Sequence, residues 1–82
     1  MIYPNPASSI TTVRFDSKNE WVKVELIDFS GKIVNLIYDG NLESQTHQIP
    51  VDLSDVANGE YIVSIKKTSG IETLKLLKVK SL

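Results

Sequence analysis

The chain has 82 residues, of which 9 are basic and 10 acidic, so its net charge at pH 7 is −1. This length is enough for one small domain with a single core. The balanced charge excludes the basic footprint of a nucleic-acid-binding protein. The absence of cysteine excludes disulfides and cysteine-bound metals. The apolar runs are too short for a transmembrane segment.

The first residues carry the segment Tyr3-Pro4-Asn5-Pro6. Each proline fixes its own φ and biases the residue before it toward an extended conformation. We expect residues 1–9 to be a stiff linker with an exposed aromatic hook, and residues 10–82 to form the folded unit. The segment lacks a basic stretch followed by an apolar core, so it is no signal peptide. Any signal for crossing the inner membrane is therefore expected on a larger chain.

Apolar and polar residues alternate along most of the chain, which is the two-residue period of β-strands. In the clearest case Val22, Val24 and Leu26 face a core, while Lys23 and Glu25 face water. Predicted strands, separated by turn signals, cover Ile10 to Phe15, Glu20 to Ile27, Ile33 to Tyr38, Gln45 to Leu53, a strand centred on Val63, and Ile71 to Val79. The pattern predicts an all-β fold, an immunoglobulin-like antiparallel β-sandwich of about seven short strands.

The stretch from Val51 to Ile65 gives the main evidence for this fold, because it contains a turn followed by a central strand. Asn58-Gly59 marks a tight turn that feeds a central strand, in which Tyr61, Val63 and Ile65 alternate with polar residues. Ile62 interrupts the alternation, so we expect this strand to be covered on both faces. Further turns are expected at Asp28 to Lys32, with Gly31 at positive φ, at Asp39-Gly40-Asn41, and at Thr68-Ser69-Gly70. Pro50 indicates a sheet edge or an interruption of the strand, and Trp21 caps an edge or anchors a partner.

The sequence contains no recognisable catalytic set. His47 is the only histidine, and it has no acid or nucleophile at motif spacing, which favours an ordinary packed or solvated residue. The glycines stand singly in turns rather than in a phosphate-binding loop. Four aspartates, Asp28, Asp39, Asp52 and Asp55, lack the spacing of a calcium loop and suit turns instead. Lys75, Lys78 and Lys80 form a mild basic stripe, typical of a solvated strand face or of protection against edge pairing. We therefore predict no enzyme, no cofactor and no metal site.

Four motifs, in this order, resemble the C-terminal sorting domain, type A, of the type IX secretion system (the Por secretion system tail family). They are Tyr3-Pro4-Asn5-Pro6, then Asp28-Phe29-Ser30-Gly31-Lys32, then Asp52-Leu53-Ser54 with Gly59-Glu60-Tyr61-Ile62-Val63, and finally the lysine-bearing end Leu74 to Leu82. The resemblance covers the chain from Tyr3 to the last residue. Each motif is weak alone, and their order and spacing make the set specific.

The resemblance implies a sandwich at the C-terminus of a larger exported protein of Bacteroidota, and a domain that catalyses nothing. The cargo would enter the periplasm by its own N-terminal signal. The outer-membrane translocon would then recognise the sorting domain, and a sortase-like cysteine protease would remove it. The cargo would finally be released or attached to anionic lipopolysaccharide, at the cell surface or outside the cell.

Carried over by position, the resemblance places recognition candidates at both ends and in two turns. Tyr3, Pro4, Asn5 and Pro6 would join the cargo to the sandwich near the cleavage point. Gly31 and Lys32 match the middle glycine-lysine turn of the family, and Gly59 and Tyr61 its glycine-x-tyrosine turn. Lys75, Lys78, Val79 and Lys80 belong to the end segment on which export depends. If the last strand is at a sheet edge, its unpaired backbone groups can add to a strand of the receptor or of another copy.

Two positions depart from the family pattern. Glu60 stands where an aliphatic residue is commoner, and Met1-Ile2 stand where cargo or a linker should precede. We therefore expect the native polypeptide to continue upstream.

The alternative from another functional class is an immunoglobulin-like spacer or adhesion module that binds a glycan or a neighbouring protein. A spacer can be followed by further domains, whereas a sorting domain must end its polypeptide. Glycan binding would also need clustered exposed aromatics, whereas Tyr3, Trp21, Tyr38 and Tyr61 lie on different predicted elements.

Overall fold

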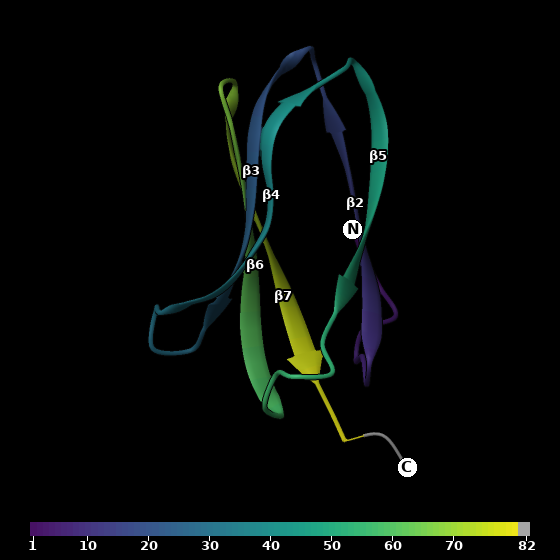
Figure 1. The fold of residues 1–82 in the computed structure, drawn as a ribbon, viewed down its shortest axis with the longest axis vertical. Coiled ribbons are helices and arrows are strands. Elements are labelled where there is room, and N and C mark those ends of the chain that lie inside the picture. The colour runs from purple at the N-terminus through teal and green to yellow at the C-terminus, as the bar shows by residue number, and fades with distance from the viewer. Residues whose placement is uncertain (81–82) are drawn as a thin grey trace.

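The computed structural model describes residues 1–80, which form seven β-strands and no helix. The strands are β1 (Ile2–Tyr3), β2 (Ile10–Ser17), β3 (Glu20–Asp28), β4 (Ile33–Leu42), β5 (Gln45–Asp52), β6 (Gly59–Lys67) and β7 (Gly70–Lys78). Two antiparallel sheets, ordered β1-β2-β5 and β4-β3-β6-β7, lie face to face along the 39 Å long axis (Figure 1). The all-β, immunoglobulin-like sandwich predicted from the sequence is confirmed.

The core lies between the sheets and follows the predicted alternation. Val22, Val24 and Leu26 of β3 are fully buried, and Val63 and Ile65 of β6 join them. The side chains contributed by the opposite sheet and its flanking segments are Ala7, Val13, Phe15, Val51 and Leu53. Because side chains alternate between the two faces of a strand, each strand supplies every second residue to this layer.

The chain crosses from β5 to β6 through a tyrosine corner. The ring of Tyr61 lies in the core, and its hydroxyl donates a hydrogen bond to the Ala57 carbonyl at 2.6 Å, the arrangement known from immunoglobulin-like sandwiches. Gly59 begins β6 with φ of 148°, a conformation that strains residues with a side chain. The hydrogen-bonded turn of this crossing lies earlier than Asn58-Gly59: the Val56 N–H donates to the Leu53 carbonyl at 3.0 Å, whereas Asn58 is a bend and Gly59 already belongs to β6. The expected central position of β6 is confirmed, since it lies between β3 and β7.

Strand β4 is longer than the sequence predicts, and the expected turn at Asp39-Gly40-Asn41 is wrong. These residues continue the strand, because β3 extends back to Glu20 and offers partners as far as the pair Glu20 with Leu42. Gly40 serves packing instead of a turn: a Cβ atom there would lie 3.1 Å from the Tyr38 hydroxyl.

Two expectations about the outer face of the four-stranded sheet are also wrong. Ile62 is 41% exposed, so the outer face of β6 is not covered at this position. Glu25 does not face water; it is buried on the outer face beside Lys66, whose ammonium lies 3.5 Å from its carboxylate. Trp21 belongs to the inner strand β3, and its indole N–H donates to Asp39 of the edge strand β4 at 2.8 Å. A central strand has neighbours on both sides, and their side chains cover polar groups that alternation alone assigns to solvent.

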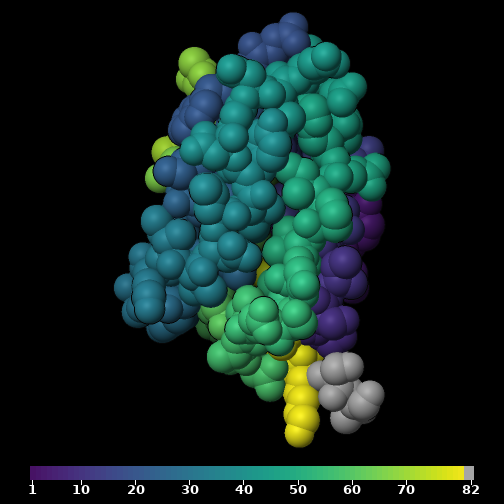
Figure 2. Space-filling model, viewed as in Figure 1, coloured from purple at the N-terminus to yellow at the C-terminus, as the bar shows by residue number. Residues whose placement is uncertain are grey.

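The N-terminal segment is part of the sandwich, in contrast to the linker expected for residues 1–9. Ile2 and Tyr3 pair with Val13 and Thr12 of β2, and Ala7 is 1% exposed within the core. Backbone pairing and apolar burial therefore begin before residue 10. In the space-filling view, residues of β4 and β5 form much of the near face, while the yellow segment that follows β7 projects at the bottom (Figure 2).

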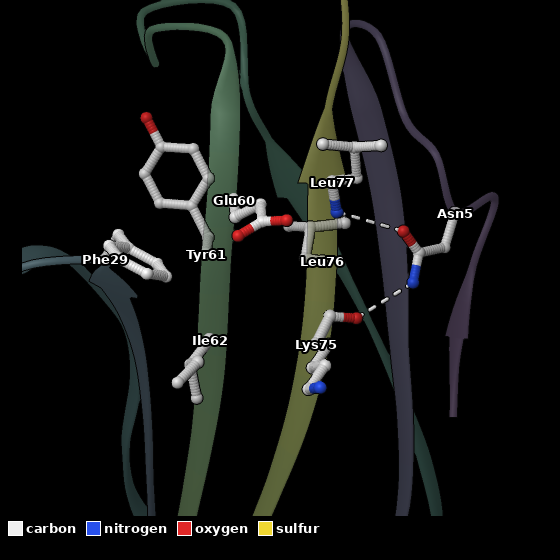
Figure 3. Close-up of a pocket in the computed structure, with 8 residues that line it drawn as sticks. All are labelled: Asn5, Phe29, Glu60, Tyr61, Ile62, Lys75, Leu76 and Leu77. Carbon is white, nitrogen blue, oxygen red and sulfur yellow. Dashed lines mark hydrogen bonds between the residues drawn. The ribbon is translucent and has the colours of Figure 1, made fainter.

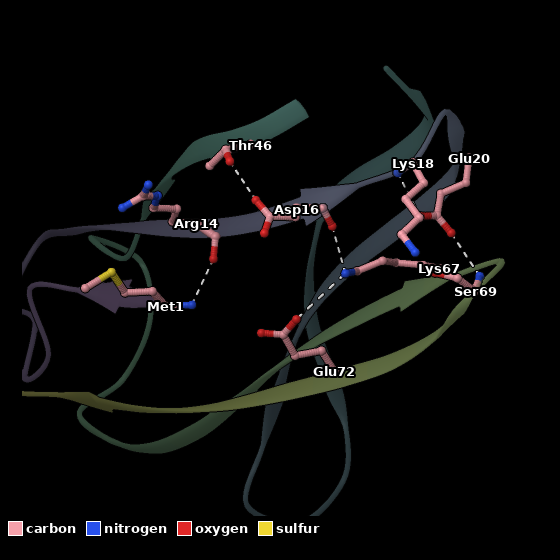
Figure 4. Close-up of polar contacts among 9 residues, drawn as sticks. All are labelled: Met1, Arg14, Asp16, Lys18, Glu20, Thr46, Lys67, Ser69 and Glu72. Atoms are coloured by element: carbon pink, nitrogen blue, oxygen red, sulfur yellow. Dashed lines mark hydrogen bonds and ion pairs between the residues drawn. The ribbon is translucent and has the colours of Figure 1, made fainter. Parts of the chain in front are cut away.

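One lysine ties the sheets together at the end opposite the β5–β6 crossing. The Lys67 ammonium donates to the Asp16 carbonyl of β2 at 2.8 Å and pairs with Glu72 of β7 at 3.8 Å (Figure 4). It also lies 5.9 Å from the centre of the Phe15 ring, within cation–π range. Lys67 thus closes this side of the core by contacts to both sheets.

Three carboxylates cap turns and have a lowered pKa. Hydrogen bonds from Ser30 and from the Lys32 N–H hold the pKa of Asp28 below its ordinary value of 3.8. A hydrogen bond from the Ser54 N–H does the same for Asp52, and hydrogen bonds from Ser69 lower the pKa of Glu20. In each case the ionised group is the better acceptor.

The tyrosine corner predicts a specific loss of stability. Tyr61→Phe removes the hydroxyl from a buried site, so we expect the free energy of unfolding to fall by about 1 kcal/mol, measured by urea denaturation. Tyr38→Phe is the matched control: its hydroxyl bonds the Asn41 carbonyl at 3.3 Å in an exposed position, and the expected loss is below about 0.5 kcal/mol. Equal losses would contradict a structural role for the corner.

The lowered pKa values of the turn carboxylates predict how the stability of the domain changes at acidic pH. A carboxylate whose pKa is lower in the folded state than in the unfolded state stabilises the fold. Its full contribution is present when the pH is above the pKa of the unfolded state, and it is lost as the pH falls through the pKa of the folded state. Stability should therefore decline below about pH 4, as followed by the urea midpoint. Asp28→Asn keeps an oxygen acceptor but cannot titrate, so its decline should be shallower. A decline identical to that of the unmodified domain would show that Asp28 does not contribute.

Candidate recognition surface

The two ends of the chain, both expected to take part in recognition, lie together in the structure. The Asn5 side-chain amide donates to the Lys75 carbonyl at 2.8 Å, and its oxygen accepts the Leu77 N–H at 3.0 Å (Figure 3). These partners are 70 and 72 residues away from Asn5 in the sequence. One side chain therefore satisfies two backbone groups on the outer edge of β7.

Ala7 continues the cover along the same edge. Its N–H donates to the Leu77 carbonyl at 2.9 Å, and its carbonyl accepts the Val79 N–H at 2.8 Å. These bonds form an isolated parallel bridge between Ala7 and Lys78. We call residues 4–7 the guard, because they cover the outer edge of β7 from Lys75 to Val79.

The two faces of β7 have different roles. Leu76 and Lys78 point inward: Leu76 is in the core, and the Lys78 ammonium donates to the Val56 carbonyl at 3.0 Å. Lys75 and Leu77 point outward and are exposed. The predicted solvated stripe of lysines is therefore wrong for Lys78, which is only 9% exposed and anchors the β5–β6 crossing. Lys80 is exposed beyond the strand, and Val79 is 37% exposed.

A groove of about 350 Å³ is lined in part by these outward residues. Its apolar lining includes Phe29, Ile62 and Leu77, and its charged lining is Glu60 and Lys75 (Figure 3). Phe29 is 85% exposed in the β3–β4 connection, although a phenyl ring is usually buried. Neither Phe29 nor Leu77 was among the recognition candidates inferred from the sequence. For Phe29, the sequence did offer a signal of surface exposure, because this aromatic residue stands in the middle of the turn Asp28 to Lys32.

The glycine turns shape the fold rather than line the groove. Gly31 has φ of 90° in the β3–β4 connection, as predicted, and the Lys32 N–H donates to Asp28. Gly59 pairs with Lys78 across the β6–β7 ladder. Tyr61 borders the groove, but its ring belongs to the core.

Tyr3 and Pro4 contact the three-stranded sheet. The Tyr3 hydroxyl donates to the Gln48 side chain of β5 at 2.7 Å, and the Thr11 hydroxyl donates to the Pro4 carbonyl at 2.9 Å. Tyr3 is thus a bound side chain rather than a free hook. Pro6 is exposed and does not border the groove.

The one histidine lies beside a serine, in a structural setting. The Ser17 hydroxyl donates to the Glu43 carbonyl at 2.7 Å, and His47 Nε2 lies 2.9 Å from both oxygens. Ser17 is 4% exposed, so its hydroxyl is inaccessible to a substrate. Within residues 1–80 no group of three or more histidines or acids is placed to hold a metal ion, and no helix there is long and apolar enough to cross a membrane.

Because Lys78 points inward and Lys75 points outward, we expect their substitution to have different effects on stability. Lys78→Ala removes a buried stem and the bond to Val56, so we expect the free energy of unfolding to fall by about 1–3 kcal/mol. Lys75→Ala on the outward side should change it by less than about 0.5 kcal/mol. Urea denaturation of both variants measures this, and similar effects would contradict the assigned orientations.

Comparison with known proteins supplies one match. The family model for the secretion system C-terminal sorting domain matches residues 1–80. No curated protein and no solved structure matches the chain. Members of this family are sorting signals, in general non-catalytic, that act with the type IX machinery in export toward the cell surface or the extracellular space. The chain therefore belongs to the family of secretion system C-terminal sorting domains and is a type IX sorting signal.

Proposed function

We propose that the outer membrane translocon of the type IX system recognises this domain through the outward side of β7 and the adjoining groove. The observation that carries the proposal is the combination of the exposed residues Lys75 and Leu77 with the groove that Phe29 borders. These side chains are not needed for the core, so they are available to a receptor. The domain catalyses no reaction and needs no cofactor or metal in this role.

A rigid display of this surface suits a signal that follows different cargoes. Both neighbouring elements of the groove are held in place: β6 by pairing with β3 and β7, and the β3–β4 connection by the Asp28 cap. Because the surface of the domain is already ordered before the receptor binds it, it loses little conformational entropy on binding. The same surface can therefore be presented whatever domain precedes it.

We place the cleavage junction before β1. Tyr3 pairs with Thr12 of β2, and Asn5 is bound to β7, so neither is available as the extended loop that a protease needs. A sortase-like cysteine protease would then act on the chain that links the cargo to Ile2. After transit through the periplasm, the cargo is released or attached to anionic lipopolysaccharide.

The spacer or glycan-binding alternative has less support from the arrangement of aromatics. Tyr61 is in the core, and Tyr3 bonds β5 of the other sheet. Trp21 bonds Asp39, whereas Phe29 borders the groove. These rings do not form the shared platform on which a sugar would stack.

The test is export of a fluorescent reporter in a bacterium with this secretion system. The reporter carries an inner-membrane export signal and ends in residues 1–82. We expect it outside the cell, and we expect Lys75→Glu combined with Leu77→Ser to lower the exported fraction at least about tenfold by removing contacts at the centre of the interface. Thr12→Ser on the outer face of the other sheet is the matched control and should be exported normally.

Surface substitutions are preferable to deletion of Lys75 to Leu82. That deletion removes Leu76 from the core, so a trapped reporter would report unfolding as readily as loss of recognition. Circular dichroism of the purified variants establishes that they are folded. Normal export of the folded Lys75→Glu, Leu77→Ser variant would disprove the role of β7.

A further inference from the structure

The guard, residues 4–7, occupies the β7 edge that a receptor strand would need. We propose that the guard is displaceable: it keeps the part of this edge from Lys75 to Val79 closed to foreign strands, and it lifts when the receptor adds an extended strand to β7. This inference rests on the proposed function, since the receptor is the type IX translocon. It adds a competition between an internal segment and a partner for one edge.

The bonds that the guard makes identify the class of ligand that suits this edge. The Asn5 carboxamide imitates a peptide unit, with a donor for the Lys75 carbonyl and an acceptor for the Leu77 N–H. Ala7 supplies a backbone bridge in the parallel direction. Both contacts are those of a β-ladder, so the fitting occupant is an extended polypeptide strand.

The guard satisfies only part of the edge. Pro4 and Pro6 have no N–H to donate, and the bonds run only from the Lys75 carbonyl to the Val79 N–H. The backbone groups of alternate residues point the same way, which directs those of Ile71 and Thr73 outward as well. Within residues 1–80, no segment outside the strand ladders forms a backbone hydrogen bond with Ile71 or Thr73. An incoming strand would pair along all of β7.

The guard is held by few apolar contacts. Residues 4–6 are exposed, and Ala7 is its only buried member, with the smallest apolar side chain and hence little area to re-expose. Downstream, the Ser9 carbonyl accepts the Leu53 N–H at 2.8 Å, which fixes the start of β2. Lifting residues 4–7 therefore leaves the strand pairing of β2 in place, and it costs the bond from the Thr11 hydroxyl to the Pro4 carbonyl and the burial of Ala7.

Native-state amide exchange measured by NMR tests whether the guard lifts. Leu77 and Val79 donate to the guard, whereas Leu76 and Lys78 point toward β6. We expect Leu77 and Val79 to exchange at least about tenfold faster than Leu76 and Lys78, through local opening. Asn5→Ala should speed exchange at Leu77 a further tenfold or so by removing its acceptor. Thr46→Ala, which removes the exposed bond to Asp16, should leave this ratio unchanged. Equal exchange at all four amides would overturn the proposal.

The export assay tests the competition itself. Asn5→Ala should raise the amount of reporter exported at early times, and an unchanged or lower amount would overturn the role of the guard. Failure of the unmodified domain to direct export would instead refute the proposed function, while amide exchange would still decide whether the guard lifts. A dimer of Asn5→Ala in sedimentation would assign the edge to a second copy and overturn the choice of the receptor.

Discussion

The two sheets are held together by one layer of side chains, since each strand turns only every second residue inward. Val24, Leu26, Val63 and Ile65 lie in this layer, and all four are fully buried. A chain of 82 residues has no material for a second layer. Its outer faces and strand edges therefore remain at the surface, where they must tolerate water or serve a partner. The inward side chains therefore determine the stability of the domain, while its outer faces and strand edges are available for function.

The sheet edges are protected by different devices. On the three-stranded sheet, β1 has only two residues, and β5 contains Pro50. On the four-stranded sheet, the β3–β4 pair has two register shifts, and bulges of this kind disturb an edge for pairing. The edge of β7 is covered by the guard from Lys75 onward. Short strands, prolines and bulges are permanent features of an edge, whereas a separate segment can be exchanged for another strand.

Folding and recognition use neighbouring residues of the same strand. Inward-pointing Lys78 holds the β5–β6 crossing, while outward-pointing Lys75 and Leu77 border the groove. A family motif that spans the strand thus combines positions with different physical roles. Tyr61 and Gly59 belong to the folding set, because one forms the tyrosine corner and the other needs a positive φ. Substitutions can therefore separate loss of stability from loss of a receptor contact.

The amino-acid sequence alone determined the fold class, the central position of β6, the inward residues of β3 and the family, because alternation and turn residues are local signals. Tertiary structure decided what depends on neighbours distant in the chain. Pairing with β3 extends β4 past Gly40, and the neighbouring strands bury Glu25. The Asn5 side chain forms hydrogen bonds with the backbone of β7. No local pattern encodes these outcomes, because they arise when segments up to 72 residues apart share backbone hydrogen bonds. For the same reason the linker expected at residues 1–9 is instead part of the sandwich, with Ile2 and Tyr3 paired to β2 and residues 4–7 forming the guard on β7.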